Sequence, residues 1–331
     1  MHYNGGPTST VLIMKLATLK DGTRDGQLAV VARDLKTAHI ADGIAPTLQA
    51  ALDDWAFIAP QLAALYDELN AGRARRPFDF DPGRCMAPLP RAYQFVVGEA
   101  YGDRSDDEPR LVQCASDELL GPTDDIVVAH EEWGLDFGAG VAVVTGDVVM
   151  GATPDDAHHQ IRLLMLVNEV SLRNLIPSEL AKPATSFSPV AVTPDELREA
   201  WRDAKAHLLL RTSWNGHLVG QSDPGGMVFN FAQLIAHLAR TRNVRAGSIV
   251  GSGVVSNGEA LRGYACIEEQ RRWEILEHGE AVTQFMRFED TVRIDTLDEN
   301  GVSVMGLSSR KLKEWNDNVN SLTEQCPPRK L

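Results

Sequence analysis

Two side chains of opposite charge, Glu169 and Lys182, are the residues through which this sequence could do chemistry. A carboxylate held in a cleft can accept or return a proton, and an ammonium group can stabilise negative charge on a substrate. Taken alone, a carboxylate on a strand is more often a solvated or ion-paired surface group than a catalytic one. Together, the two side chains predict acid–base chemistry if the fold brings them into one pocket.

His130 is a further candidate for a general base, because imidazole exchanges protons near neutral pH. A lone histidine is also commonly structural, so both interpretations stay open. Glu268 and Glu269 likewise have two interpretations. They are either pocket carboxylates or one part of a charged run that continues through Arg272 on a solvated face, and the charge pattern favours the second.

Four segments resemble the fumarylacetoacetate hydrolase family. Residues 131–146 resemble its strand D-F-E-x-E-x-A-x-V, in which two glutamates alternate along one face and hold a divalent metal. Residues 167–174 resemble its N-D-x-S-x-R strand, with Glu169 at the aspartate position. Residues 181–189 resemble the following lysine-bearing segment, and residues 246–257 resemble the strand that ends in G-x-G-T.

The resemblance implies a metal site that this sequence retains only in part. The family's three carboxylates make an oxygen site suited to Mg²⁺ or Ca²⁺. Gly138 and Gly140 stand at the two glutamate positions and offer no side-chain oxygen, which leaves Glu169 as the one retained candidate ligand. We therefore expect no metal cofactor, and Mg²⁺ or Ca²⁺ only if the family site is partly kept. Two glycines on one face of a strand also predict extra room in the pocket.

The resemblance also implies which residues line the substrate pocket. Val254 replaces the family threonine that contacts the substrate, which makes that position apolar. Tyr101 stands where the family has a Tyr-x-x-His element, but no histidine follows it here. The predicted pocket residues are Tyr101, Gly138, Gly140, Gly253, Val254 and Glu269, and the predicted catalytic residues are Glu169, Lys182 and His130.

The elements that must position these residues fall into two domains. Short strand-like runs separated by turn signals, followed by a helical apolar pattern over 48–69 with Thr47 as its N-cap, predict a small α/β domain over 14–83. Residues 84–312 predict the family's mixed β-sandwich roll. We expect residues 1–13 to be a disordered arm and residues 313–331 a tail.

Within the roll, strands are expected at 126–129, 140–145, 161–172, 266–275, 290–294 and 302–307, with a helix at 232–240. Asn215-Gly216 predicts a hairpin turn. The predicted fold class is therefore α+β, mostly β.

The composition excludes several classes of partner. A net charge of −14 without a basic run argues against nucleic acid and anionic membranes. No apolar run approaches the roughly 20 residues of a membrane span. The four cysteines have no C-x-x-C spacing, so neither a zinc site nor a disulfide framework is indicated. We expect reduced thiols in a cytoplasmic protein.

The family resemblance implies a C–C bond hydrolase of β-diketo or acylpyruvate-type acids, usually a homodimer. Because the two glutamates, the histidine and the threonine are replaced, we expect divergence to a metal-independent lyase, isomerase or cyclase acting on a small carboxylic acid or dicarbonyl compound. A non-catalytic homologue that binds a small molecule or a partner is the alternative.

Overall fold

The computed structural model describes residues 11–102, 108–175, 180–183 and 185–315. Most of the predicted arm and tail lie outside these ranges. Within them, the backbone N–H of Leu12 donates to Asp195 Oδ2 at 2.7 Å, and β20 continues to Glu314. The domain boundaries remain predictions.

Eleven of the described strands form one sheet, in the order β4-β3-β2-β1-β13-β10-β9-β18-β5-β6, with β12 also paired to β10. The N-terminal strands therefore join the sheet of the larger domain through the short strand β13. The strands are β1 (Lys15–Leu19), β2 (Gln27–Val31), β3 (Thr37–Ile40), β4 (Phe78–Asp79), β5 (Phe95–Gly98), β6 (Leu111–Cys114), β9 (Ala139–Thr145), β10 (Ile161–Glu169), β12 (Thr185–Phe187), β13 (Ala191–Val192) and β18 (Ile249–Gly251).

A second sheet of five described strands has the order β17-β16-β19-β20-β7. Strands β16 and β17 meet at Asn215 and Gly216, which confirms the predicted hairpin turn. Its strands are β7 (Ile126–Val128), β16 (Leu209–Trp214), β17 (His217–Ser222), β19 (Thr291–Leu297) and β20 (Ser308–Glu314). Two short pairs complete the described strands: β8 (Leu135–Asp136) with β11 (Ser171–Leu172), and β14 (Trp201–Arg202) with β15 (Lys205–Ala206).

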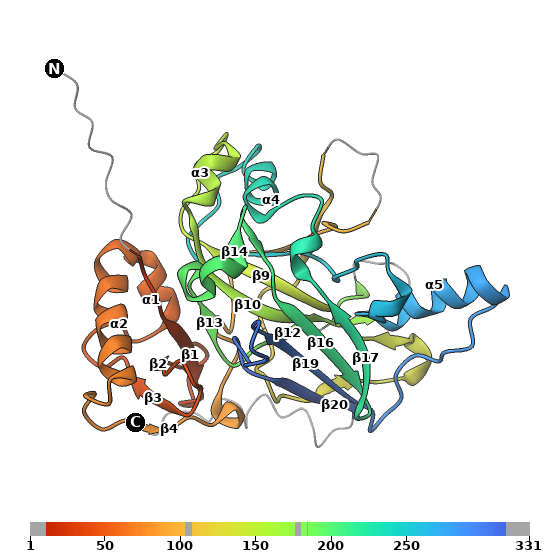
Figure 1. Ribbon diagram of the computed structural model, residues 1–331, viewed down its shortest axis with the longest axis horizontal. Helices are drawn as coiled ribbons and strands as arrows, with labels where there is room; N and C mark the ends of the chain where they lie inside the picture. Colours follow the sequence, from red (N-terminus) through yellow and green to blue (C-terminus); the bar gives the residue numbers. More distant parts are fainter. Residues whose placement is uncertain (1–10, 103–107, 176–179, 184, 316–331) are drawn as a thin grey trace.

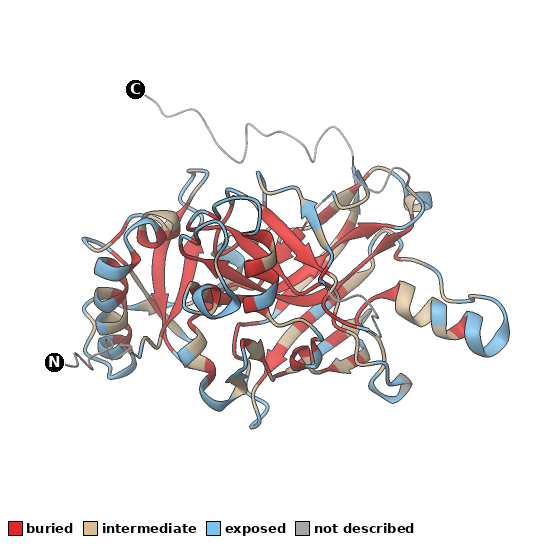
Figure 2. Ribbon diagram, turned by 90° about the horizontal axis from the view of Figure 1, so that it is seen from above, coloured by how far each residue is buried: buried red, intermediate tan, exposed pale blue. Residues whose placement is uncertain are grey.

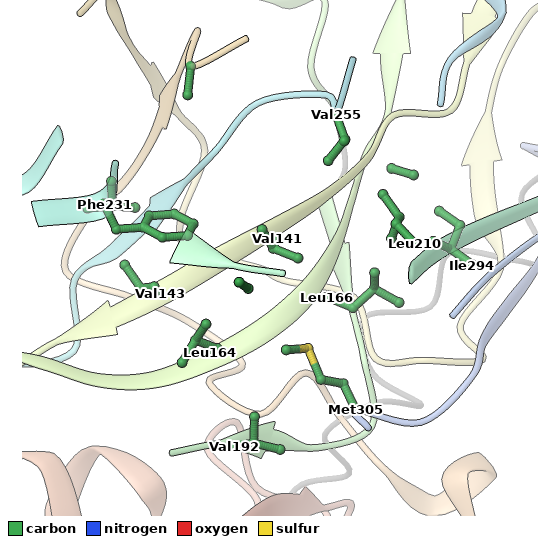
Figure 3. Packing of buried hydrophobic residues seen from close by; sticks show 14 of the residues in the cluster. Val141, Val143, Leu164, Leu166, Val192, Leu210, Phe231, Val255, Ile294 and Met305 are labelled. Atoms are coloured by element: carbon green, nitrogen blue, oxygen red, sulfur yellow. The ribbon is translucent and has the colours of Figure 1, made fainter. Parts of the chain in front are cut away.

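The main core lies between the two sheets (Figure 3). Val141 and Leu166 on the large sheet face Leu210 and Ile294 on the small one. Their sequence neighbours on β9 and β10 point to the opposite face, because side chains alternate along a strand. That opposite face belongs to a second apolar cluster, which extends to α1 and α2.

Helices α1 (Leu48–Asp53) and α2 (Trp55–Asn70) cover the N-terminal strands (Figure 1). They confirm the predicted apolar pattern, which breaks at Asp54. Thr47 caps α1 by accepting the backbone N–H of Ala50 at 3.2 Å, as predicted. Among the other helices, α3 (Pro154–His158) lies beside α4 (Phe231–Leu238), which confirms the predicted helix near 232–240.

Residues 266–275 form no strand, and this prediction was wrong. They belong to helix α5 (Ile267–His278), which extends away from the body and is mostly exposed (Figure 2). Glu268 pairs with Arg272 one turn along the helix at 3.3 Å, and Gly279 ends it with φ of 86°. Such i,i+4 pairs and a left-handed C-terminal glycine are helix signals that the apolar residues of this segment obscured.

The chain that returns from α5 is tied to the helix by Glu274. Its carboxylate accepts the backbone N–H groups of Val282 at 2.8 Å and Thr283 at 2.9 Å. Burial alone raises the pKa of Glu274, but these bonds and those from the Thr283 hydroxyl and Gln270 lower the pKa to about 2. The helix and its return segment thus form one hydrogen-bonded arm.

The predicted strand at 302–307 was also wrong, because β20 begins only at Ser308. Gly301 and Gly306 both have positive φ, of 75° and 81°. Left-handed residues at both ends of this segment turn the chain rather than extend it.

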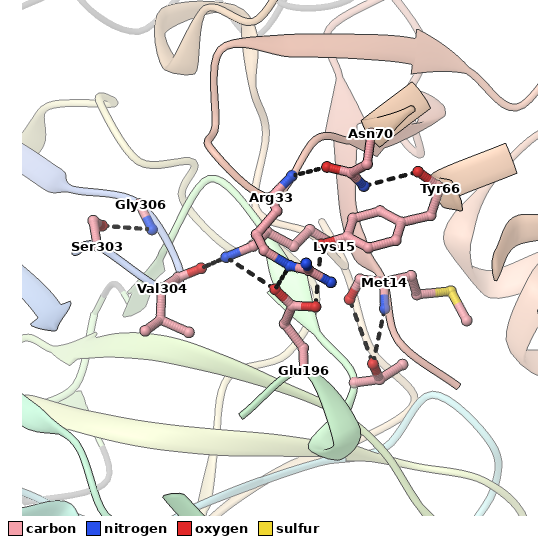
Figure 4. Close-up of polar contacts among 10 residues, drawn as sticks. Met14, Lys15, Arg33, Tyr66, Asn70, Glu196, Ser303, Val304 and Gly306 are labelled. Carbon is pink, nitrogen blue, oxygen red and sulfur yellow. Dashed lines mark hydrogen bonds and ion pairs between the residues drawn. The ribbon is translucent and has the colours of Figure 1, made fainter. Parts of the chain in front are cut away.

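A buried polar cluster joins the N-terminal domain to the roll (Figure 4). Glu196 pairs with Arg33 at 3.4 Å and Lys15 at 3.8 Å, and it accepts the hydroxyl of Tyr66 at 3.1 Å. Lys15 also donates to the carbonyl of Val304. Contacts from both domains therefore converge on one carboxylate.

The predicted fold class is confirmed: the described chain is α+β and mostly β. Within the described residues, no helix is both long enough and apolar enough to cross a bilayer.

Candidate active site

The candidate site forms where the ends of β10, β9 and β18 meet. Glu169 is the last residue of β10, and its backbone N–H donates to the carbonyl of Gly138 at 2.7 Å. In return, the backbone N–H of Gly138 donates to Asn168 Oδ1 at 2.9 Å. Gly140 lies opposite Val167 in the β9–β10 ladder. This pairing fixes Glu169 beside the two glycines that the sequence singled out.

The structure brings Glu169 and Lys182 together. Lys182 Nζ lies 3.1 Å from Glu169 Oε2, and the Glu169 side chain is only 3% exposed. The other carboxylate oxygen, Oε1, is buried and has no hydrogen-bond partner among the described residues. A buried acceptor without a donor costs about 1–3 kcal/mol, so this oxygen is set up to receive a donor from a ligand.

Lys182 remains a cation in this setting. Burial alone would lower the pKa of its ammonium group, but the charge of Glu169 and the hydrogen bond to it outweigh burial and raise the pKa. Its side chain is 28% exposed, so the ammonium group spans the buried carboxylate and the surface. The pair therefore offers a carboxylate and a permanent positive charge side by side.

The two glycines are packed against other atoms, so the predicted extra room was wrong. A Cβ on Gly138 would lie 2.7 Å from the carbonyl oxygen of Glu169 and 2.8 Å from Val254 Cγ2. A Cβ on Gly140 would lie 2.6 Å from the carbonyl oxygen of Gly253. Glycine is required at these positions because the neighbouring backbone and Val254 approach the strand closely.

The turn after β18 explains Gly253 and Val254. Gly253 has φ of 80°, and a Cβ there would lie 2.4 Å from the carbonyl oxygen of Gly98, so glycine is needed on both counts. The turn directs half-buried Val254 onto Gly138. The apolar side chain that replaces the family threonine therefore fills space at the site.

Tyr101 lies in the same region, with its hydroxyl already bonded. That hydroxyl donates to the carbonyl of Pro224 at 3.0 Å. Burial raises the pKa of Tyr101; a hydrogen bond with Ser252 opposes the shift, and the charges of Asp223 and Glu169 add to it. The charge of Glu169 thus reaches Tyr101 through space.

His130 and Glu269 have other contacts. His130 is exposed and packs edge to face on Trp133, with ring centroids 5.1 Å apart. Glu269 accepts the hydroxyl of Ser256 at 2.5 Å and the backbone N–H of Ala265 at 3.1 Å, which fastens the loop after Val254 to the start of α5. No described contact joins either residue to Glu169, and their predicted roles remain predictions.

Cys114, on the edge strand β6, is a site residue that sequence reasoning missed. Burial raises the pKa of its thiol to about 11, with Lys182 lowering it and Glu169 raising it. Both site charges therefore act on this half-buried thiol. The sequence carries no signal for its position, because β6 reaches the site only through its pairing with β5.

Asp136 was also missed, although it precedes the glycine pair in the family-like motif. It is fully buried, lies 2.9 Å from Arg173 and accepts the backbone N–H groups of Ile267 at 2.6 Å and Glu268 at 3.1 Å. Burial raises the pKa of Asp136 despite these partners. Asp136 thereby links β8 to the N-terminus of α5 and supports the end of the site.

These residues do not fit a divalent cation held by three carboxylates. Gly138 and Gly140 supply no side-chain oxygen, and one oxygen of Glu169 already binds Lys182. The described residues contain no group of three or more His, Cys, Asp or Glu side chains arranged to hold a metal. Two surface cavities, of about 250 and 420 Å³, lie at α5 and beside the β1–β2 turn, and neither is lined by Glu169 or Lys182.

Curated relatives match parts of this chain. A 2,4-didehydro-3-deoxy-L-rhamnonate hydrolase from Sphingomonas sp. (strain SKA58) is 28% identical over 158 residues, which cover 44% of this chain and 52% of the relative. The oxaloacetate tautomerase YisK from Bacillus subtilis (strain 168) is 25% identical over 217 residues, covering 60% of this chain and 70% of the relative. The chain thus spans about half the length of the first relative.

Solved structures share the fold over almost the whole chain. A maleylpyruvate hydrolase from Sphingobium sp. SYK-6, in complex with manganese(II) and pyruvate, aligns with a TM-score of 0.66 at 14% identity, covering 92% of this chain and 100% of that one. The fumarylacetoacetate hydrolase of Exiguobacterium antarcticum aligns with a TM-score of 0.63 at 16% identity, covering 91% and 100%.

Two family models match the sequence itself. The model described as fumarylacetoacetase N-terminal domain 2 matches residues 14–91, and the model described as fumarylacetoacetate (FAA) hydrolase C-terminal matches residues 86–304. The second match alone spans more than half of the chain. On this ground the chain belongs to the fumarylacetoacetate hydrolase family.

Proposed function

We propose that this protein catalyses a metal-independent proton transfer, an isomerisation or tautomerisation, on a small carboxylic acid that carries a carbonyl group. The observation that carries the proposal is the buried Glu169, with one oxygen on Lys182 at 3.1 Å and the other without a partner in the described chain. A base and a fixed cation are the two groups that such a reaction needs.

The chemistry balances with these two residues. Glu169 takes the proton from the carbon next to the carbonyl group, and the electron pair of the broken C–H bond moves to form a C=C bond while the carbonyl oxygen becomes negative. Lys182 stabilises that oxygen. Glu169 then returns the proton to the oxygen or to another carbon, which releases the enol or the isomer. No water molecule is consumed.

Hydrolysis of a C–C bond has less support in this site. It requires a base that activates water, and His130, the predicted candidate, is exposed against Trp133. The names of two related proteins, an oxaloacetate tautomerase and a 2-hydroxyhepta-2,4-diene-1,7-dioate isomerase, agree with proton transfer as a reaction of this fold. Specific C–C hydrolysis therefore stays the less favoured reaction.

A second candidate function is a non-catalytic homologue that binds a small molecule or a partner. The observation that favours it is the close packing at Gly138 and Gly140, where Val254 and the backbone of Gly253 occupy the space that side chains would need. The predicted homodimer and cytoplasmic location belong to either proposal. Light scattering of the purified chain tests the dimer.

Turnover is tested with oxaloacetate and with acylpyruvates by following enol absorbance in metal-free buffer. Wild type is expected to accelerate the keto–enol conversion, whereas Glu169→Gln and Lys182→Met abolish the acceleration. Glu289→Gln, which removes an exposed carboxylate paired with Lys311, is the matched control. Equal rates in wild type and Glu169→Gln would refute catalysis by this pair.

Ligand protection of Cys114 separates the two candidate functions. A bound acid is expected to slow alkylation of this thiol by N-ethylmaleimide, because the thiol senses both site charges. A Cys326→Ser background removes the cysteine that lies outside the described residues, and Cys85 and Cys266 are buried. Protection without turnover would favour the binding homologue, whereas neither result would reject both.

A further inference from the structure

The candidate site carries its own positive charge. A carboxylate as buried as Glu169, at 3% exposed, is costly unless a cation accompanies it. A related hydrolase was solved with manganese(II) and pyruvate. In the present chain, the positive charge at Glu169 is the ammonium group of Lys182, 3.1 Å from Oε2.

The surroundings of Glu169 suit an ammonium group better than a divalent ion. Ca²⁺ and Mg²⁺ require about six or more oxygen ligands, and most protein sites supply several carboxylates. Here Oε1 lies 3.4 Å from the position of a Cβ on Gly251, which also contacts Val97 and Phe95. These neighbours are glycine and apolar side chains, so the carboxylate has no described second carboxylate beside it.

Val254 occupies part of the space that a glutamate at position 138 would use. Its Cγ2 lies 2.8 Å from the position of a Cβ on Gly138, and the carbonyl oxygen of Glu169 lies 2.7 Å from that position. The loss of oxygen ligands, the apolar filling and the added lysine contact therefore occur at one set of strand ends.

We infer that Lys182 is a built-in replacement for the divalent cation, which neutralises Glu169 permanently and presents its remaining N–H donors to an anionic ligand. The specificity that follows is for an acid whose carboxylate or enolate oxygen accepts from an ammonium group. This inference holds whether or not the proposed proton transfer occurs, because it concerns the cation at Glu169 alone.

An ordinary structural ion pair would have a different consequence from a replacement cation. If Lys182 substitutes for a cation, its removal leaves a site at Glu169 that binds a cation from solution, and wild type does not bind one there. A structural pair would leave no such selective site when the lysine is shortened.

The experiment measures Mn²⁺ binding by electron paramagnetic resonance and thermal unfolding in MnCl₂, MgCl₂ or methylammonium chloride. The proteins are wild type, Lys182→Ala, Lys182→Ala with Glu169→Gln, and Lys313→Ala, which removes a lysine paired with Asp125 at the surface. Lys182→Ala is expected to gain a saturable rise in Tm with at least one of these cations. The other three proteins are expected to show none.

Two outcomes would overturn the inference. One is stoichiometric Mn²⁺ binding to wild type that Glu169→Gln removes, a measurement that depends on no destabilising variant. The other is a folded Lys182→Ala protein, verified by circular dichroism, whose Tm no cation raises. If Lys182→Ala does not fold, Lys182→Gln replaces it in the same measurements. Neither readout uses turnover, so failure here is distinguishable from failure of the proposed proton transfer.

Discussion

Two buried carboxylates in this molecule pair with lysines, and they differ in how completely their oxygens are bonded. At the domain junction, Glu196 has Tyr66 at 3.1 Å, Arg33 at 3.4 Å and Lys15 at 3.8 Å. At the strand ends, Glu169 has Lys182 on one oxygen and no described partner on the other. The junction is a finished structural contact, whereas the strand ends retain binding capacity.

The two lysines differ in the same sense. Burial lowers the pKa of Lys15, and the charge of Glu196 offsets this only in part. Burial also opposes the charge of Lys182, but Glu169 outweighs burial and raises the pKa. A structural cluster spreads its bonds over many partners, while the candidate site concentrates one strong pair and leaves an acceptor free. Such incomplete bonding is typical of functional sites.

The largest effect is expected from Glu196→Ala at the junction. It removes the carboxylate that three side chains share and leaves Lys15 buried without its counter-ion, so the free energy of unfolding should fall by about 3–5 kcal/mol. Urea denaturation followed by fluorescence measures the change. Asp34→Asn, in an exposed pair with Lys36, is the control and should change stability by less than about 0.5 kcal/mol. A loss below about 1 kcal/mol would contradict the junction's role.

Gly138→Ala is expected to lower the free energy of unfolding by about 1–3 kcal/mol, because the added Cβ meets Val254 Cγ2 and a backbone oxygen. Val254→Ala in the same chain should recover part of this loss, since only the side-chain obstacle is removed. A double-mutant cycle measures the coupling. Additive effects of the two substitutions would show that Val254 does not pack on Gly138.

Glu169→Gln sharpens the comparison by acting in the opposite way to a change at Glu196. It removes a buried charge with an unbonded oxygen, so stability should change by less than about 1 kcal/mol in either direction. Ligand protection of Cys114 should nevertheless be lost. Thermal unfolding and the alkylation assay give the two results. A large loss of stability would make Glu169 a structural residue like Glu196.

The smallest effect concerns the α5 arm. The pKa of Glu274 is depressed from 4.5 to about 2, so its contribution to the arm is complete above about pH 4.5 and declines as the pH falls towards 2. Protection factors for the amides of Val282 and Thr283 should fall in this range while those of β9 persist. Glu274→Gln should remove the pH dependence. Uniform protection down to pH 2.5 in wild type would contradict it.

The sequence predicted the elements whose local signals agree with their packing. The hairpin at Asn215-Gly216, the helical pattern after Thr47 and the helix near 232–240 are all present. Helix α5 was mistaken for a strand because little of it is buried: only Ile267 and Glu274 are. An exposed helix lacks the apolar periodicity on which such predictions depend.

The site was predictable in its residues but not in its contacts. Family resemblance singled out Glu169 and Lys182, and only the structure shows that they form an ion pair. The packing of Val254 onto Gly138 depends on the turn at Gly253, which brings two distant strands together. Cys114 could not be found, because sheet order rather than sequence places β6 near the site.

The short strand β13 also has a mechanical consequence. It pairs with β1 through Ala191 and Val192, and with β10 through Val192 and Leu164. Tension applied to the N-terminal strands would therefore load this narrow bridge in shear and pass to the strand that ends at Glu169. Cutting the chain between the two domains would expose the pairing edge of β13, which makes this protein an unsuitable donor of separate modules.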